Sequence, residues 1–366
     1  MNANLSSRTS SATISRKRTG RKGNAAPTIS DVAREARCSP MTVSRVINGE
    51  GNVRESTRET VQEAIAKLNY SPNRAARSLA GGAEVRIGMV FDNPSSSYLA
   101  EFLMGALEEA TKRNIHLEVQ SGDTVPDNSE LIGRMVEGGT TGFILPPPLS
   151  DDPSVLKLIV DAGGIAVSVG AAVTGGGNGA VLIDEFKAAY DMTRHVLSLG
   201  HEKIGFIVGN PEQMAAGQRL EGYRAAMEEA GLAIPEAFVV QGYFTYRSGM
   251  KAAERLLAAD PRPTAIFASN DDMAAATVAV AHRLHLDVPG DLTVCGFDDT
   301  EAATSIWPEL TTIRQPIREM TAKAVELIAT IARSKRQGNA SKSTTITFPH
   351  ELIRRESDAA PANADR

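Results

Sequence analysis

The sequence predicts a small all-helical N-terminal module followed by a larger α/β body built of two doubly wound lobes. Three observations lead to this fold class. Residues 1–82 are basic and contain short helical patterns separated by a tight turn, whereas the remaining chain is acidic. From Val85 onward, apolar strands alternate with amphipathic helices, which is typical of a parallel sheet covered by helices. Ile87-Gly88 recurs 117 residues later as Ile204-Gly205, so we expect the α/β unit to be present twice.

Length and composition narrow the class of protein. A chain of 366 residues is too long for one compact core of typical size. Hydrophobic residues make up 42% and charged residues 23%, as in globular proteins, and no apolar run is long enough to cross a bilayer. The only cysteines, Cys38 and Cys295, lie far apart, which argues against a disulfide framework or a zinc module. We therefore expect a cytoplasmic protein with no metal and no other cofactor.

The net charge of −5 hides a strong asymmetry. Residues 1–82 contain 14 Lys+Arg and 6 Asp+Glu, a net charge of +8. The remaining 39 − 14 = 25 basic and 44 − 6 = 38 acidic residues give the body a net charge of −13. A basic module on an acidic body is attracted to a polyanion through the module alone, and nucleic acid is the leading candidate partner.

Residues 1–27 are rich in Ser, Thr, Arg and Lys and contain no acidic residue. This composition predicts a flexible basic arm. An organellar transit peptide and a mis-assigned start codon are alternatives, although the arm has no amphipathic apolar face. An apolar core of 7 to 15 residues, which a secretory signal needs, is missing from the arm.

Residues 28–68 predict three helices. Thr28 or Ser30 can cap the first helix, which runs to Ala36. Ser39 offers an N-cap and Pro40 a favourable first position for a second helix that runs to Asn48. The third helix extends over 55–68. The second helix points short polar or basic side chains outward, as a helix in the DNA major groove would, although any three-helix bundle shows the same periodicity.

The residues themselves add a resemblance. Ile29-Ser30-Asp31-Val32-Ala33, Ser39-Pro40-Met41-Thr42-Val43-Ser44-Arg45-Val46-Ile47-Asn48-Gly49 and Leu68-Asn69-Tyr70-Ser71-Pro72-Asn73 closely resemble the headpiece of the lac repressor (LacI/GalR) family of bacterial transcription regulators. The resemblance implies a helix-turn-helix headpiece over 28–72. It implies base contacts from Pro40, Met41 and Arg45, and further DNA contacts from Thr28, Thr42, Ser44, Asn48 and Thr57. Arg54 departs from the small capping residue usual in the family.

Residues 73–82 follow the headpiece as a short Arg- and Ala-containing segment. The resemblance implies a hinge helix that folds when two copies meet on DNA and inserts Leu79 into the minor groove, with Asn73 and Arg77 as further DNA contacts. The alternative is an ordinary linker. The tail after Ser357 has no heptads, so we expect a homodimer on a pseudo-palindromic operator.

The body, 83–356, resembles periplasmic sugar-binding proteins, as in the same family. The resemblance places about 85–183 and 315–335 in the first lobe, about 184–314 and 343–356 in the second, and leaves 357–366 as a polar tail. Ligands of open α/β sheets bind beyond the carboxyl ends of the strands, so the cleft between the lobes is the expected site.

Polar residues follow two predicted strands of the second lobe, beginning at Asn270 and at Asp298. Such residues can bind ligand hydroxyls or cap the next helix. By resemblance, Arg219, Asn270 and Asp298 hold the effector, Phe244 stacks on it or belongs to the core, and Gln315 is a weaker candidate. The loop ending at Tyr98 also faces the ligand but departs from the family pattern.

The sequence thus predicts a DNA-binding transcriptional regulator, a repressor whose operator affinity is controlled by a small molecule. A carbohydrate is the expected effector and a purine or other metabolite the alternative, acting as inducer or as corepressor. Three rivals are a transport or sensing protein, an enzyme, and an architectural DNA protein. No GxxxxGK[ST], HExxH or GxSxG motif supports an enzyme, and we expect no membrane association.

Overall fold

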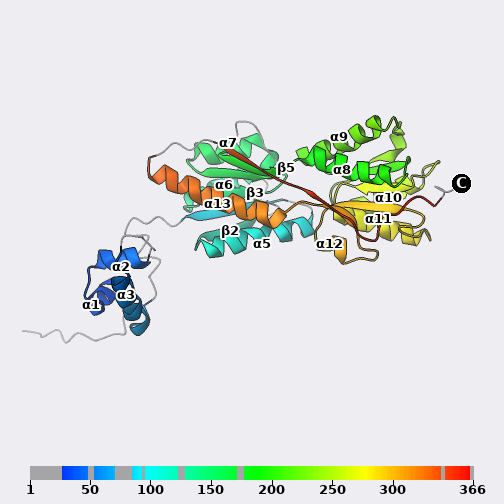
Figure 1. Cartoon of the computed structure of the whole chain (residues 1–366). Helices are drawn as coiled ribbons and strands as arrows, with labels where there is room; N and C mark the ends of the chain where they lie inside the picture. The colour runs from blue at the N-terminus through cyan, green and yellow to red at the C-terminus, as the bar shows by residue number, and fades with distance from the viewer. Residues whose placement is uncertain are drawn as a thin grey trace, which may run out of the picture. The chain divides into compact units, whose positions relative to one another are not determined.

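The computed structural model describes residues 27–47, 53–70, 85–92, 95–122, 128–170, 177–338 and 343–362 (Figure 1). The predictions for the arm up to residue 26, for Asn48 and for the hinge with Asn73, Arg77 and Leu79 lie outside these residues. The chain forms two compact units, 1–83 and 84–366, which are considered separately below.

The described part of the first unit, 27–47 and 53–70, is a bundle of three helices, α1 (Ile29–Glu35), α2 (Pro40–Ile47) and α3 (Glu55–Lys67). Their inner faces meet in a small core centred on Val32, Val43 and Val61, which are fully buried. The N-terminus of α1 is fixed by Asp31, whose Oδ2 accepts hydrogen bonds from the backbone N–H of Thr28 at 2.9 Å and from its hydroxyl at 2.7 Å. The predicted three-helix arrangement is confirmed.

The turn between α1 and α2 has the predicted chemistry. Arg37 has a positive φ of 51°, which ends α1 and reverses the chain. Ser39 then caps α2, because its Oγ accepts a hydrogen bond from the backbone N–H of Thr42 at 3.1 Å. Pro40 occupies the first position of α2, where its missing N–H costs nothing.

The first lobe of the second unit is a six-stranded parallel sheet with the order β11-β5-β4-β3-β1-β2. Its strands are β1 (Arg86–Phe91), β2 (His116–Ser121), β3 (Gly142–Leu145), β4 (Ile165–Val169), β5 (Gly179–Ile183) and β11 (Thr344–Phe348). The helices are α5 (Ser96–Lys112), α6 (Asn128–Glu137), α7 (Pro153–Asp161), α13 (Ile317–Arg336) and the short η2 (Leu149–Asp151).

The second lobe repeats this architecture with the order β12-β10-β9-β8-β6-β7, in which only β12 is antiparallel. Its strands are β6 (Ile204–Val208), β7 (Val239–Gln241), β8 (Ala265–Ala268), β9 (Thr293–Asp298), β10 (Thr311–Arg314) and β12 (Glu351–Ile353). Its helices are α8 (Glu185–Ser198), α9 (Met214–Glu229), α10 (Tyr246–Leu257), α11 (Asp271–Arg283), α12 (Glu301–Thr304) and the short η3 (Glu236–Phe238). The predicted two-lobed α/β fold is confirmed.

Three segments cross between the lobes: β5 to α8, β10 to α13, and β11 to β12. Figure 1 shows the last of these as the red ribbon that runs from one lobe to the other. The crossing corrects one predicted boundary, because residues 344–348 pair with β5 in the first lobe and do not belong to the second. The polar tail expected from residue 357 also differs, since Ser357 and Asp358 are buried against the second lobe.

The internal repeat has a packing reason. Gly105 in α5 faces the backbone of Arg318 in α13, and a Cβ at this position would overlap with it. Gly222, its equivalent in α9, faces the backbone of Phe186 in α8 in the same way. Each lobe therefore uses one glycine to let two helices approach closely.

Candidate functional site

The outward face of α2 carries the residues predicted to read DNA. Pro40, Met41 and Arg45 are exposed, and Met41 retains 65% of its accessible surface although it is a large apolar residue. Thr42 and Ser44 are half-buried on the same helix, and Thr57 is half-buried near the start of α3. This face has the size and the donor groups that a helix needs in the major groove.

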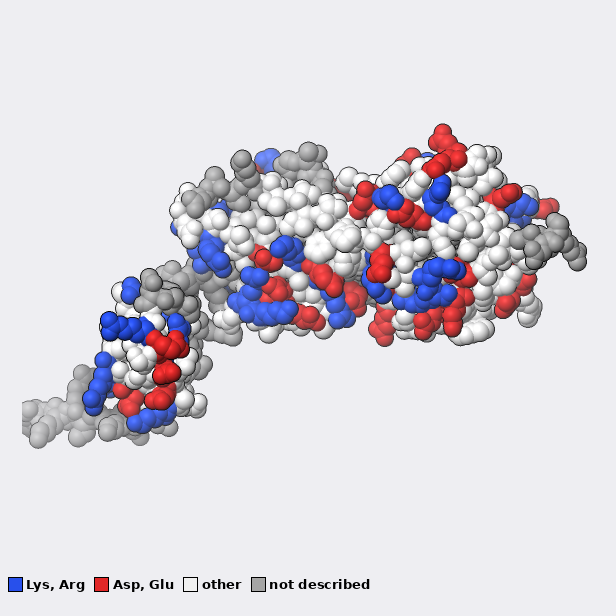
Figure 2. All heavy atoms as spheres, viewed as in Figure 1, with Lys and Arg blue, Asp and Glu red and all other residues white. Residues whose placement is uncertain are grey.

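The folded bundle itself is nearly neutral. Its described residues contain six basic and five acidic side chains, so most of the +8 charge of residues 1–82 belongs to segments outside them. Several of these charges pair with one another, including Lys67 with Glu35 at 2.6 Å and Arg34 with Asp31 at 3.0 Å. Figure 2 accordingly shows both signs of charge on the bundle. The prediction of a DNA-binding face on α2 therefore depends on the placement of Arg45 and its neighbours and not on the net charge of the bundle.

A buried arginine lies in the second lobe, close to the end of β9. Arg219 of α9 is 4% exposed, and its Nε donates to Oε2 of Glu185 at 2.8 Å. Its Nη1 lies 3.6 Å from Oδ1 of Asp298, and its guanidinium carbon lies 3.6 Å from the ring centroid of Phe297. We call Arg219, Glu185, Asp298 and Gln315 the arginine cluster.

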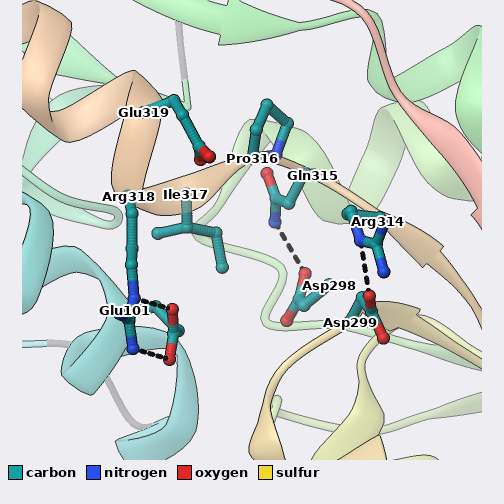
Figure 3. A pocket seen from close by; sticks show the side chains of 9 residues that line it. All are labelled: Glu101, Asp298, Asp299, Arg314, Gln315, Pro316, Ile317, Arg318 and Glu319. Atoms are coloured by element: carbon teal, nitrogen blue, oxygen red, sulfur yellow. Dashed lines mark hydrogen bonds and ion pairs between the residues drawn. The ribbon is translucent and has the colours of Figure 1, made fainter.

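Asp298 ends β9 and meets the crossover from β10 to α13. Gln315 in this crossover donates from Nε2 to Oδ1 of Asp298 at 2.6 Å (Figure 3). Asp298 and Asp299 both have positive φ values, 114° and 58°. Such backbone conformations are strained for residues other than glycine and are found mainly at functional sites.

A pocket of about 170 Å³ opens beside this crossover. Figure 3 shows Glu101 and Arg318 on its first-lobe side and Asp298, Asp299 and Arg314 on its second-lobe side. Residues that line the pocket form two ion pairs. Arg314 Nε donates to Asp299 Oδ2 at 2.7 Å, and Arg318 Nη2 donates to Glu101 Oε1 at 3.0 Å. The pocket therefore lies where the two lobes hinge, next to the arginine cluster.

Asn270 and Phe244 are packed together behind the cluster. Asn270 Oδ1 accepts from the backbone N–H of Met273, and its Nδ2 donates to the carbonyl of Phe244, both at 3.0 Å. Asn270 thus caps α11, which is the structural role that its position also allowed. Phe244 is buried, and its ring lies 5.7 Å from the guanidinium carbon of Arg219. Both residues are thus buried beside Arg219 in the second lobe.

Tyr98 is the predicted residue from the first lobe, and it is buried in α5. Burial, followed by the negative charges of Asp298 and Glu185, raises the pKa of its hydroxyl. The hydroxyl is therefore within electrostatic reach of the arginine cluster. Arg219 lies close to Asp298 and Phe244, Asp298 is hydrogen-bonded to Gln315, and Phe244 is hydrogen-bonded to Asn270. That these residues and Tyr98 bind an effector stays a prediction.

Burial and neighbouring charges shift the pKa values of three buried groups, Asp298, Asp271 and Arg219. Burial raises the pKa of Asp298 well above its usual value, although Arg219 opposes the shift. Burial also raises the pKa of Asp271 to about 7, despite hydrogen bonds from the hydroxyl of Thr312 and the N–H of Thr300. Burial would lower the pKa of Arg219, but Glu185 and then Asp298 raise it further than burial lowers it.

Contacts across the cleft involve residues that the sequence did not single out. Oδ2 of Asp272 in α11 accepts from the hydroxyl of Ser95 at 2.6 Å, and its Oδ1 from that of Ser97 at 3.1 Å. From the first lobe, Oδ2 of Asp151 accepts from the backbone N–H of Met214 at 2.7 Å and so caps α9 of the second lobe. We call the contacts of Asp272 with Ser95 and Ser97 the first latch, and the contact of Asp151 with Met214 the second latch. The sequence pointed only to the surroundings of the first contact, through Asp272 after Asn270 and through the loop that ends at Tyr98.

Gln213 precedes α9 beside the second latch. It is buried, and its Nε2 has no hydrogen-bond partner among the described residues. A buried amide donor without a partner costs free energy, which makes Gln213 a further candidate contact for a bound molecule. Nothing in the local sequence pattern identified it.

No helix in the described parts of the chain has the length and apolar character needed to cross a membrane. Within the same residues, no group of three or more His, Cys, Asp or Glu side chains is placed to hold a metal ion.

Comparisons with known proteins agree with this architecture. Residues 28–73 match the profile described as bacterial regulatory proteins, lacI family, and residues 193–357 match that of a periplasmic binding protein-like domain. The chain is 33% identical over 343 residues to catabolite control protein A of Priestia megaterium, which covers 90% of this chain and 98% of that protein.

Two solved structures share the fold over nearly the whole chain. The transcriptional regulator CelR in complex with cellobiose has a TM-score of 0.68 and 29% identity, over 90% of this chain and 99% of that one. The lac repressor dimer bound to operator and the anti-inducer ONPF has a TM-score of 0.70 and 25% identity, over 91% and 99%. With the helix-turn-helix bundle and the two hinged lobes, these similarities show that the chain belongs to the lacI family of bacterial regulatory proteins.

Proposed function

We propose that this protein is a sequence-specific DNA-binding transcriptional repressor controlled by a small molecule bound between its two lobes. The observation that carries the proposal is the combination, in one chain, of an outward DNA-reading face on α2 with a buried arginine cluster at an interlobe cleft. It acts where the bacterial chromosome lies, in the cytoplasm.

The headpiece reads operator DNA through α2. Arg45 can make a bidentate contact with guanine, Met41 an apolar contact with a base, and the hydroxyls of Thr42 and Ser44 contacts with phosphates. Thr28, Pro40, Asn48 and Thr57 complete the contacts of the headpiece, and Asn73, Arg77 and Leu79 those of the hinge.

The cleft binds the effector, which we propose to be a carbohydrate. Arg219 and Asp298 offer charged donors and acceptors for neighbouring hydroxyls, Gln315 and Gln213 add amide groups, and Phe244 and Tyr98 add aromatic surface. The similarity to CelR, which was solved in complex with cellobiose, supports a sugar as the effector. Binding that changes the angle between the lobes changes operator affinity through a coupling free energy of typically 1 to 3 kcal/mol.

The protein acts as a homodimer, as the lac repressor does in its operator complex. Exposed apolar residues lie on both lobes, Met104 and Leu107 on α5 and Tyr246 and Trp307 on the second lobe. We propose that a second copy covers them. Trp307 is the chain's only tryptophan and is 71% exposed, so its fluorescence should shift to shorter wavelength as protein concentration rises. Emission independent of concentration, with a monomeric mass throughout, would contradict the dimer.

The regulator is tested by selecting bound sequences from a random DNA library and measuring their affinity by fluorescence anisotropy. Arg45→Ala is expected to weaken binding to the selected site by about 1 to 3 kcal/mol and to relax preference at one base pair. Arg34→Ala, on the exposed surface of α1, is the matched control. Equal affinity and selectivity of the parent and Arg45→Ala would overturn the assignment of α2.

The effector is tested by a thermal-shift screen of sugars and nucleosides, since a ligand that binds only the folded state raises Tm. Hits are then titrated into the protein–operator complex. An inducer weakens operator binding and a corepressor strengthens it. An Asp298→Asn variant should lose the thermal shift. A ligand that raises Tm but leaves operator affinity unchanged would separate binding from regulation, and turnover of the ligand would favour an enzyme.

A further inference from the structure

The end of the first lobe farthest from the cleft carries a second pocket, of about 310 Å³. The strands of this lobe are parallel, and the neighbouring strands β1 and β2 both begin there, after Val85 and Ile115. Helices α5 and α13 end at the same place, because each runs antiparallel to the strands. The floor of the pocket is apolar, formed by Val85, Ile115 and Ala329, and its rim carries Arg113, Arg333 and Arg336. We call this surface the basic end.

The basic end is an exception on an acidic body. After Glu326 the rest of α13 has no acidic residue, whereas it includes Arg333, Lys335 and Arg336. Lys335 donates to the carbonyls of Gly163 at 3.5 Å and Gly164 at 3.2 Å, neutral partners that leave its charge uncompensated. The net charge of the body is nevertheless −13. Positive charge is therefore concentrated where the rest of the surface repels a polyanion.

Among the rim arginines, Arg113 is only partly neutralised. It forms an ion pair with Glu109 one helical turn earlier and lies 3.8 Å from Glu326 of α13. Arg333 and Arg336 lie in the last turn of α13 and are exposed. Basic residues at the end of a helix stabilise its negative pole by about 0.3 to 1 kcal/mol. Stabilisation of the helix pole explains why α13 ends in basic residues. It does not explain why Arg113, which follows α5, lies at the same pocket.

We propose that the basic end is an auxiliary DNA contact that binds backbone phosphates beside the operator. The planar guanidinium fork matches the geometry of a phosphate, and three arginines around one pocket suit such a group. Only 14 residues separate Tyr70, at the end of the headpiece, from Val85 on the floor of the pocket. A headpiece bound to DNA therefore tethers this surface to the same duplex and raises its effective concentration there. The proposal rests on the DNA binding proposed above.

The test uses the full-length protein and a fluorescent duplex of random sequence, because phosphate contacts do not depend on base sequence. Anisotropy titrations at 50 to 200 mM salt give the slope of log K against log salt, which changes by about 0.9 for each phosphate contact. We expect Arg333→Gln with Arg336→Gln to lower affinity and to reduce the slope by about 1 to 2. Glutamine keeps helix propensity, and thermal unfolding confirms that both variants fold.

The matched control removes two positive charges from the equivalent end of the second lobe. Lys203 and Arg262 are exposed and precede β6 and β8, so Lys203→Gln with Arg262→Gln makes the same change in net charge. This pair is expected to leave the slope unchanged. Equal slopes for the parent and the Arg333/Arg336 pair would overturn the proposal, as would equal reductions in both pairs, which would indicate net charge alone.

Three further outcomes separate the alternatives. If inorganic phosphate raises the Tm of the parent but not that of the Arg333/Arg336 pair, while DNA affinity is the same in both, the pocket binds a free anion and the proposal is wrong. If the parent binds no DNA at any salt concentration, the proposed function itself fails. If Arg45→Ala weakens binding but the Arg333/Arg336 pair does not, the function stands and only the auxiliary contact is excluded.

Discussion

Arg219 is the residue on which the electrostatics of the cleft depend. It is buried between Glu185, Asp298 and the ring of Phe297, so both carboxylates rely on it for compensation. Because breaking a buried pair strands a charge, we expect Arg219→Met to lower the free energy of unfolding by about 3 to 5 kcal/mol. Adding Glu185→Gln to this variant should recover part of the loss. Urea denaturation measures both effects.

The control for this prediction is on the same helix. Arg224 is exposed and pairs with Glu221 at 2.9 Å, and Arg224→Met should change the free energy of unfolding by less than about 1 kcal/mol. If Arg219→Met is as mild as Arg224→Met, the carboxylates do not depend on Arg219.

Asp271, buried at the start of α11, makes the free energy of unfolding depend on pH. Burial raises its pKa from 3.8 to about 7, so between these values the folded protein keeps a proton that the unfolded chain has released. Its contribution to stability is present below pH 3.8 and is lost as the pH rises through about 7. We expect the free energy of unfolding of the parent, minus that of Asp271→Asn, to fall from pH 4 to pH 7. A difference that stays flat over this range would contradict the shift.

At the scale of single residues, the sequence located part of the site. Arg219, Asp298 and Gln315 were identified and do form one cluster, and Asn270 has the capping role that its place before a helix allowed. Glu185, Asp151 and Gln213 were missed. Glu185 and Asp151 bind partners that are distant in sequence, Arg219 and Met214, and Gln213 is distinguished only by its burial. No local sequence pattern predicts such a contact or such burial.

At the scale of helices, close packing depends on two glycines. A Cβ at Gly222 of α9 would overlap with the backbone of Phe186 in α8, whereas Gly217 of the same helix has nothing within 4 Å of its missing Cβ. We expect Gly222→Ala to lower the free energy of unfolding by about 1 to 3 kcal/mol, because the helices must separate. Gly217→Ala should raise it by about 0.5 to 1 kcal/mol. Thermal and urea unfolding of the two variants measure the difference, and the same sign for both would refute this explanation of the repeat.

The helices and strands were largely predictable, because burying one face of each makes its apolar residues recur at a regular spacing in the sequence. Several elements begin within about a residue of their predicted positions, including the strands at Val85 and Ala265 and the helices at Pro40 and Asp271. The error concerns β11, which was assigned to the second lobe. An edge strand has the same alternating pattern whichever sheet it joins, and only the pairing of Thr344–Phe348 with β5 decides its lobe.

At the scale of the whole molecule, the two latches should open together. Ser95 and Asp151 belong to the first lobe and Asp272 and Met214 to the second, so each rigid lobe contributes to both latches. We expect Asp272→Ala to accelerate hydrogen exchange at the amide of Met214, about tenfold for each 1.4 kcal/mol by which closure is weakened. Mass spectrometry of peptides covering the start of α9 measures this exchange.

The control removes an acidic side chain from the first turn of a helix without touching a latch. Glu130 is exposed in the first turn of α6, and Glu130→Ala should leave exchange at Met214 unchanged. If Asp272→Ala also leaves it unchanged, the lobes do not move as rigid bodies and the two contacts are independent.

The sequence by itself determined the helix-turn-helix, the strand and helix alternation, the internal repeat and the family, since these depend on local periodicity, turn chemistry and motifs read along the chain. The tertiary structure alone decided which lobe holds β11, how Glu185 and Asp298 share Arg219, which side chains latch the cleft, and where the arginines of α5 and α13 converge. The physical reason is distance. Burial and hydrogen-bond geometry depend on where the lobes, strands and helices meet in space, and residues far apart in the chain acquire their charge balance and their partners only when the chain has folded.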